Sequence, residues 1–163
     1  MGRKGLQIAV VGGAECGPEA ARQAYEVGRG LAEEGAVLLC GGRGGVMERA
    51  AAGARSAGGL TLGILPGSGP ADSAANPEID IDLYTGLGQA RNLVLVLSAQ
   101  AVIAIGGGWG TLSEIALALK HRRPVVRLGS WRLVRPDGAD DEILLEADSP
   151  AEAVARALAL GAS

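Results

Sequence analysis

The chain has 163 residues, which fits one domain built around one hydrophobic core. Hydrophobic residues make up 48% of it and charged residues 20%, and glycine follows no three-residue period, so disordered and collagen-like chains are excluded. The net charge is −3 and basic residues form no long run, so a nucleic-acid partner has little electrostatic support.

The N-terminal half alternates short apolar runs with stretches of helical periodicity or composition. The apolar runs end at or next to glycine or proline, which is typical of buried parallel strands that lead into tight loops. The helical stretches are bounded by glycine or proline, as helices often are. Strands are therefore predicted at 6–11, 36–40, 60–65 and, as a short one, 79–83, and helices at 18–34 and 46–57.

The chain begins like a secretory signal peptide, because the basic residues Arg3 and Lys4 precede the first apolar run. This run stops at Gly12 and Gly13 and is too short for that role. No other stretch approaches the roughly 20 apolar residues of a membrane span. These observations predict a cytoplasmic protein with no membrane partner.

The segment 68–76 carries no periodicity and is the longest predicted loop. Pro70 lies within it and Pro77 follows it. Its two candidate roles are a lid over a ligand and a simple surface excursion, and the sequence leaves both open.

The next stretch, 87–97, is compatible with two structures. Leu93 to Leu97 is a run of five aliphatic residues, as in a strand, while Leu87, Ala90, Val94 and Leu97 form a helical stripe. We predict a helix with this stripe facing inward. Leu93 and Val96 lie off the stripe, so the helix is apolar nearly all round and needs a second burying surface. A second copy of the chain is the simplest such surface, which predicts a homodimer or a higher homo-oligomer.

The C-terminal half continues the alternation of strand and helix. The apolar run 101–105 predicts a strand, and the glycine-rich stretch 106–111 leads into a helix that runs to about Lys120. Residues 149–152 form a capping box with proline in the first turn, so a last helix is expected to end near Leu160. Further strands are predicted at 125–128 and, as a terminal hairpin across 136–138, at 131–134 and 143–145.

This order of elements predicts the fold class. Strands that alternate with helices through short loops give an α/β, Rossmann-like three-layer sandwich with a mostly parallel sheet. No linker or internal repeat divides the chain, so one domain is expected over 1–163. In such folds ligands bind at the carboxyl ends of the strands.

Several catalytic classes lack the residues they need. The two thiols, Cys16 and Cys40, and the single histidine, His121, are too few for a zinc site, so no protein-held metal is expected. His121 lies in a cationic helix end, where an exposed histidine is favoured and a catalytic triad is not. Lysine occurs only as Lys4 and Lys120, which excludes a pyridoxal-phosphate enzyme. No cofactor is therefore expected to be required.

Two strand-to-helix junctions, 41–45 and 106–110, are rich in glycine. The first amides of a helix have no partner within it, and glycine lets a phosphate approach them, so these junctions predict an anion site. The alternative is that glycine only permits tight turns and close helix–sheet packing. The loops match neither the dinucleotide nor the Walker pattern. Phosphate-binding candidates on this basis are Gly41, Gly42, Gly44 and Gly45, with Gly12 and Gly13 as a weaker third loop.

Glu114 and Arg91 are the candidate chemical pair. We expect Glu114 in the first turn of the helix after 106–110, where its carboxylate can lean into the same crevice. Alternatively, Thr111 to Glu114 is a capping box, and Glu114 only bonds the backbone at Thr111. Arg91 falls at the edge of the apolar stripe, where a guanidinium needs an anionic partner, either Glu114 or a ligand phosphate. If both face a pocket beside a sugar phosphate, the carboxylate could stabilise an oxocarbenium ion and position water.

Two segments resemble known motifs. CGGRGGVME at 40–48 resembles the GGGxxGLMG motif of the Lonely Guy (LOG) family, and GGGWGTLSE at 106–114 resembles its PGGxGTxxE motif. The similarity extends from Leu6 to about Trp131. It implies a Rossmann-like dimer and phosphoribohydrolase activity that releases a base from nucleoside 5′-monophosphates. The site residues that it implies are Arg91 and Glu114 as the catalytic pair, and Met47, Gly107, Gly108, Gly110 and Thr111 as ligand or phosphate binders.

Departures from these motifs point to a sister group. Gly106 replaces a proline, Cys40 and Glu48 replace glycines, and Asn92 follows Arg91 where hydrolases commonly have lysine. With GGLTLGILPG at 58–67, the chain looks closer to molybdenum-cofactor carrier-like proteins, whose characterised members bind a phosphorylated pterin. The resemblance therefore implies binding of a phosphorylated anionic small molecule, with the molybdenum cofactor as a carried ligand. The alternatives are a nucleoside monophosphate phosphoribohydrolase and a nucleotide sensor; the lysine decarboxylase label of many relatives lacks support.

Overall fold

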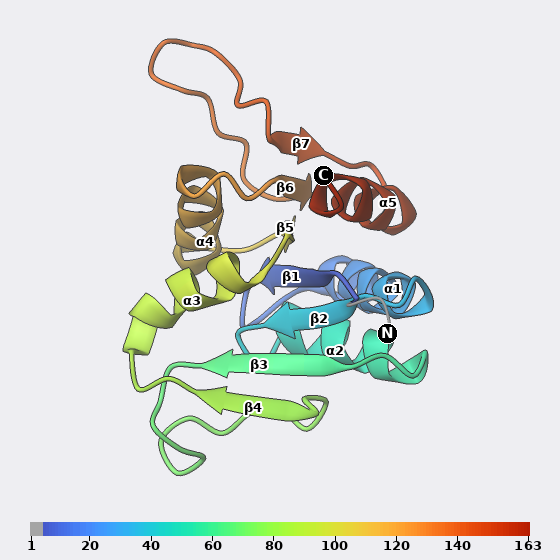
Figure 1. Cartoon of the computed structure of the whole chain (residues 1–163), viewed down its shortest axis with the longest axis vertical. Coiled ribbons are helices and arrows are strands. Elements are labelled where there is room, and N and C mark those ends of the chain that lie inside the picture. Colours follow the sequence, from blue (N-terminus) through green and yellow to red (C-terminus); the bar gives the residue numbers. More distant parts are fainter. Residues whose placement is uncertain (1–4) are drawn as a thin grey trace.

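Seven short apolar strands pair into one sheet (Figure 1), and the computed structural model describes residues 5–163. All six neighbouring pairs are parallel, in the order β4-β3-β2-β1-β5-β6-β7. Such strands are buried on both faces, which explains their nearly continuous apolar sequences. The strands are β1 (Gln7–Gly12), β2 (Val37–Cys40), β3 (Thr61–Leu65), β4 (Ile81–Tyr84), β5 (Ala101–Ile105), β6 (Val125–Leu128) and β7 (Leu144–Glu146).

The strand order changes direction between β1 and β5. After β1 the chain adds strands outward as far as β4, and then returns to place β5 on the other side of β1. Ile8 pairs with Ala101 and Gly12 with Ile105, so the two strands end together. The loops that leave their carboxyl ends diverge toward opposite faces, and this divergence opens a crevice in folds of this class.

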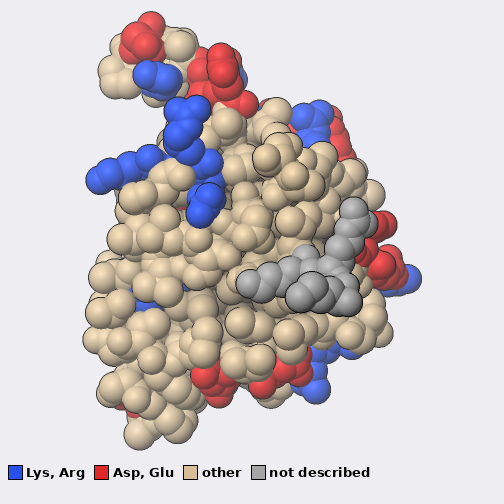
Figure 2. Space-filling view, viewed as in Figure 1, with Lys and Arg blue, Asp and Glu red and all other residues tan. Residues whose placement is uncertain are grey.

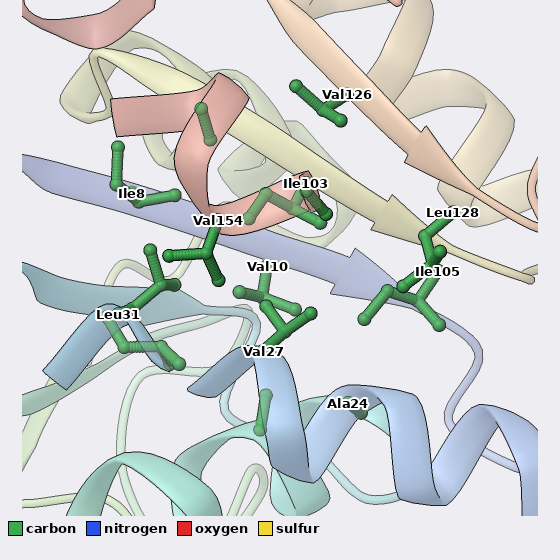
Figure 3. Packing of buried hydrophobic residues seen from close by; sticks show 14 of the residues in the cluster. Ile8, Val10, Ala24, Val27, Leu31, Ile103, Ile105, Val126, Leu128 and Val154 are labelled. Atoms are coloured by element: carbon green, nitrogen blue, oxygen red, sulfur yellow. The ribbon is translucent and has the colours of Figure 1, made fainter. Parts of the chain in front are cut away.

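Helices cover both faces of the sheet. On one face, α1 (Pro18–Glu33), α2 (Val46–Ser56) and α5 (Pro150–Gly161) share a core with the inward side chains of the strands. Figure 3 shows part of that core, where Val27 and Leu31 of α1 lie near Val10. On the other face lie α3 (Arg91–Ser98), which follows a short 3-10 turn, and α4 (Trp109–Lys120). The predicted Rossmann-like single domain is confirmed.

Local signals set most helix ends. Ser149 Oγ accepts a hydrogen bond from the amide of Glu152 at 3.2 Å, as the predicted capping box requires. The Glu152 carboxylate in turn accepts from the amide of Asp148 at 2.9 Å. Gly58 adopts φ +74° just after α2, a conformation that favours glycine. None of the helices among the described residues has both the length and the apolar character that a membrane crossing needs.

The predicted C-terminal hairpin is wrong. Residues 131–134 form no strand, and β7 pairs in parallel with β6, with Val125 opposite Leu144. A turn does form at Gly138, with the Arg135 amide bonded to the carbonyl of Ala139, but it lies in a long excursion (Figure 1). The open edge of β6 offers backbone partners that a free hairpin would lack, so residues 144–146 add to the main sheet.

The predicted inward stripe of α3 is also wrong, although the helix itself forms. Leu87 is 52% exposed and Leu97 43%, whereas Leu95 and Val96 are buried against the sheet. The α-helix begins only at Arg91, after the 3-10 turn Gly88–Ala90, so one continuous period from residue 87 does not apply. The unpartnered apolar face of α3 is therefore the one that carries Leu97.

Candidate functional site

A cavity of about 660 Å³ lies at the carboxyl ends of β1 and β5. The loop after β1, the loop after β2, the start of α3 and the start of α4 form most of its wall. Its volume is within the range of small-molecule sites. The lining residues are Gly12, Gly13, Ala14, Arg43, Met47, Pro66, Gly88, Gln89, Arg91, Asn92, Gly108, Trp109, Gly110, Thr111, Ser113 and Glu114.

The N-terminus of α4 forms one side of this cavity. Its N-cap residue is Gly108, and no side chain in the described part of the chain caps it. The first backbone bond of the helix runs from the Leu112 amide to the Gly108 carbonyl, so the amides before Leu112 lie at the end where helices lack internal partners. Gly107, at φ +101°, is needed here because a Cβ atom would lie 2.2 Å from Thr111 Oγ1. The first turn of α4 thus presents backbone donors and a positive dipole end to the cavity.

The N-terminus of α2 is built differently, despite a similar glycine loop. Its first amide, of Val46, donates to the carbonyl of Gly13 at 3.0 Å. A Cβ atom at Gly45, which has φ +63°, would lie 2.2 Å from that same carbonyl oxygen. Gly42 likewise packs against Leu65. Gly41, Gly42, Gly44 and Gly45 do not line the cavity, and close packing accounts for glycine at Gly42 and Gly45.

Arg91 supplies an unpartnered positive charge. Its Nε and Nη1 atoms are buried and have no hydrogen-bond partner among the described residues. The guanidinium lies over Gly41, where a Cβ atom would be 2.2 Å from Nη1, so a side chain at this position would displace the guanidinium. Burial lowers the pKa of Arg91, while the charge of Glu114 acts in the opposite direction. A guanidinium stays protonated even so, and its buried donors remain available to an anion.

Glu114 is a buried carboxyl group on the same cavity. Only 7% of it is exposed, and burial raises its pKa from the usual 4.5 to about 7, although the charge of Arg91 lowers it. The helix begins at Trp109, so Glu114 lies in the second turn and the expected first-turn position is wrong. Thr111 lies inside the helix and is not its N-cap, which removes the capping-box alternative. The Glu114 carboxyl group is therefore available to a ligand in the cavity.

Two polar residues of the cavity wall, Arg43 and Asn92, escaped the sequence analysis. Arg43 lines the cavity, and its backbone carbonyl accepts a bond from Asn76 Nδ2 at 2.7 Å while its guanidinium lies 3.3 Å from Ser73 Oγ. Asn92 is buried and donates to Ser113 Oγ at 3.2 Å. The sequence could have pointed to Arg43, because it is the one charged residue in the glycine run 41–45. It could not have pointed to the contact of Asn92, because that contact joins two helices that are distant in the sequence.

The long loop after β3 is tied to the loop after β2. The amide of Asn76 donates to the carbonyl of Gly42 at 2.9 Å, beside the bond from its side chain to Arg43. Asp72 accepts bonds from the amides of Ser68 and Gly69, which holds the loop's own turn. The segment 68–76 therefore braces the backbone that carries Arg43.

The structure brings together part of the predicted set. One cavity is lined by Gly12, Gly13, Met47, Arg91, Gly108, Gly110, Thr111 and Glu114, whereas Gly41, Gly42, Gly44, Gly45 and Gly107 lie outside its wall.

Cys40 is the residue just before the loop 41–45. Burial raises the pKa of its thiol to about 11, so this sulfur stays protonated at neutral pH. A second hollow of about 590 Å³, between α1 and α5, contains none of the predicted residues. The arrangement suits a ligand with a negatively charged group.

Comparison with family models gives one match. Residues 5–154 match the model of the SLOG cluster4 family. An uncharacterized protein of Archaeoglobus fulgidus is 49% identical over 76% of this chain and 80% of its own. The cytokinin riboside 5′-monophosphate phosphoribohydrolase of Mycobacterium tuberculosis is 30% identical over 66% of this chain and 62% of its own.

Two similar solved structures are those of proteins named for the molybdenum cofactor. The molybdenum cofactor binding protein of Rippkaea orientalis superposes with a TM-score of 0.83 at 40% identity, covering 95% of this chain and 96% of its own. The molybdenum cofactor carrier protein of Chlamydomonas reinhardtii gives a TM-score of 0.84 at 36% identity, covering 99% and 100%. Both likenesses extend over nearly the whole chain.

Proposed function

The chain belongs to the SLOG cluster4 family, and from this premise we propose that it binds a phosphorylated anionic small molecule in the cavity at the carboxyl ends of β1 and β5. The molybdenum cofactor, as a carried ligand, is the leading candidate, since two close structural neighbours are described by it. The observation that carries the proposal is that Nε and Nη1 of Arg91 are buried without a partner among residues 5–163, on the same cavity as the start of α4, which no side chain of these residues caps.

An anion would resolve an energetic deficit at this site. A buried donor without a partner costs about 1–3 kcal/mol, and more when it is charged. A phosphate can accept charge-assisted bonds from Arg91 while the first amides of α4 bond its other oxygens. Arg43 supplies a second positive charge on the same wall. Gly12 and Gly13 line the same wall.

Anion binding should stabilise the folded protein. Each tenfold excess of ligand over its Kd adds about 1.4 kcal/mol, which corresponds to a rise in Tm of a few degrees for a chain of this size. We expect inorganic phosphate or sulfate at millimolar concentration to raise the Tm in a thermal denaturation assay. Arg91→Ala should abolish most of this rise.

The matched control is Arg29→Ala, which removes an exposed arginine paired with Glu33 on α1, far from the cavity wall. This variant should keep the full anion-induced shift. A wild-type protein that shows no shift at millimolar anion, or an Arg91→Ala variant that shifts as much as the wild type, would contradict the proposed site.

A second function is favoured by one specific observation. The pKa of Glu114 is about 7, which suits a group that gives or accepts a proton at neutral pH. A relative described as a phosphoribohydrolase shares 30% identity with the chain. In such a role Arg91 would hold the phosphate of a nucleoside 5′-monophosphate while Glu114 stabilises the oxocarbenium ion and positions water.

Turnover is tested by incubating the purified protein with AMP and measuring free adenine and ribose 5-phosphate by chromatography. If the hydrolase function holds, both products form in equal amounts, and Glu114→Gln, which keeps the shape of the side chain, abolishes their release. Arg29→Ala, at an exposed position on α1 that does not line the cavity, is the control and should still release adenine. No release from AMP or the other common monophosphates, with anion binding intact, leaves the carrier function.

We further propose that the protein acts as a cytoplasmic homodimer or a higher homo-oligomer. The support is the exposed apolar face of α3, where Leu97 is 43% exposed, and the nearly uncharged surface over this helix in Figure 2. A second copy of the chain would cover that face.

A further inference from the structure

Trp109 is the most exposed large apolar side chain among the described residues, at 79%. The whole chain has only two Trp, two Tyr and no Phe, so an indole in water is a costly use of a scarce residue. Trp109 is the first residue of α4 and lines the same cavity as Arg91 and Glu114. Its ring therefore lies at the rim of the proposed anion site.

A second tryptophan supports this ring. The Trp131 ring centroid lies 5.4 Å from that of Trp109, with the planes inclined by 34°. Trp131 Nε1 donates to the carbonyl of Gly108 at 3.1 Å, and Ser130 Oγ donates to the carbonyl of Gly106 at 2.6 Å. Two consecutive residues thus fasten the segment after β6 to the loop that begins α4. The aromatic pair is held in a fixed position relative to the uncapped amides.

We propose that Trp109 stacks against a planar heterocycle of the bound ligand. This inference rests on the proposed function and narrows it: the ligand joins a phosphate, held at Arg91 and the start of α4, to an aromatic ring such as a purine or a pterin. Indole faces stack well on such rings, and the contact tolerates different heterocycles because each has a π face. Trp131 limits the movement of Trp109, so little ordering is needed on binding.

The first experiment compares two phosphorylated probes that differ in the ring. Isothermal titration gives the Kd of AMP and of ribose 5-phosphate for the wild type, Trp109→Ala and Trp109→Phe. Loss of a base–aromatic stack weakens binding roughly 5- to 150-fold. Trp109→Ala should therefore weaken AMP by that factor and leave ribose 5-phosphate unchanged, and Trp109→Phe should recover most of the AMP affinity.

The second experiment reads the contact directly. Trp109→Phe keeps Trp131 and its bond to Gly108, so the emission that the wild type has in excess of this variant reports on the Trp109 ring. AMP should quench this emission at saturation, and ribose 5-phosphate should not. Val134→Ala is the control for removal of an exposed apolar side chain, since Val134 is 55% exposed and does not line the cavity. It should keep the wild-type preference for AMP.

The possible outcomes distinguish the stacking role of Trp109 from the proposed binding of a phosphorylated anion. Equal affinity of the wild type for AMP and ribose 5-phosphate would overturn the stacking role and leave the anion site standing. No binding of either probe or of inorganic phosphate would overturn both. A Trp109→Ala variant that changes the oligomeric mass but keeps the AMP preference would assign Trp109 to a protein contact and overturn the inference.

Discussion

Arg91 and Glu114 line one cavity, and burial shifts the pKa of each away from its ordinary value. A close ion pair between them would have cancelled both shifts. Burial lowers the pKa of the guanidinium and raises that of the carboxyl group, and their mutual attraction opposes both shifts. A close ion pair would restore ordinary pKa values and satisfy the Arg91 donors. The separation keeps the positive charge available for a ligand and leaves Glu114 about half protonated at pH 7.

The raised pKa of Glu114 predicts a pH dependence of stability. The unfolded group titrates near 4.5 and the folded one near 7, so between these values the native state holds more protons. The free energy of unfolding should therefore fall as the pH rises through this window, by on the order of 3 kcal/mol from this group. The stabilisation is complete below pH 4.5 and is lost above pH 7.

Glu114→Gln removes this titration while keeping the shape of the side chain. Urea denaturation at pH 5 and pH 8 should show a smaller loss of stability for the variant than for the wild type. Ser113→Ala, a neighbour that does not titrate, should retain the wild-type difference between the two pH values. A variant slope equal to that of the wild type would show that Glu114 is not held protonated by burial.

At the scale of elements, two glycines set the contact between α1 and α2. A Cβ atom at Gly28 would lie 1.9 Å from the carbonyl oxygen of Ala50, and one at Gly53 would lie 2.0 Å from that of Tyr25. The helix backbones therefore touch directly. This close approach seats α2 against the sheet and fixes where the loop that carries Arg43 leaves β2.

Gly28→Ala should destabilise the fold because the new methyl group meets backbone that cannot move alone. Overpacking of this kind costs about 1–3 kcal/mol, and urea denaturation measures it. The matched control is Gly30→Ala in the same helix, where the Cβ atom would meet only a methyl group of Val154 at 3.2 Å. The control should be neutral or stabilising, since alanine favours helix over glycine by about 1 kcal/mol. Equal stabilities for the two variants would contradict the direct backbone contact.

At the scale of the whole molecule, the exposed face of α3 is the feature that one chain leaves incomplete. Leu87 and Leu97 lie on the outside of the layer that α3 and α4 form, while α1, α2 and α5 close the opposite face. A second copy would bury this surface close to the cavity, since α3 begins at Arg91. Assembly and ligand binding would then act on the same helix.

Light scattering should therefore give a mass of at least twice the 16.3 kDa of one chain. Leu97→Glu places a charge in the proposed contact and should shift the mass toward the monomer. Arg29→Glu, on α1 at the other side of the sheet, should leave the mass unchanged. A wild-type protein that scatters as a monomer would refute the homodimer.

The sequence by itself determined the element order, the parallel sheet and the layers, because apolar runs, glycine stops and the Ser149 cap are local and need no distant partner. It also singled out Arg91 and Glu114, which the fold brings to one cavity. Only the tertiary structure decided that β7 joins β6, that Leu95 and Val96 rather than Leu87 and Leu97 face the core, and that α4 begins at Trp109. Each of these depends on which surface or strand edge is nearby in space.

The two glycine loops show most clearly the difference between what the local sequence predicts and what the tertiary structure decides. In the sequence, 41–45 and 106–110 look alike, and both predict a helix start open to an anion. In the fold, no side chain among the described residues caps either helix start. The difference is that the first amide of α2, of Val46, bonds to the Gly13 carbonyl, whereas no backbone carbonyl among the described residues accepts from the first amides of α4. Whether a helix end is free depends on the neighbouring backbone, which for the first loop comes from about 30 residues earlier in the chain, and no local pattern records it.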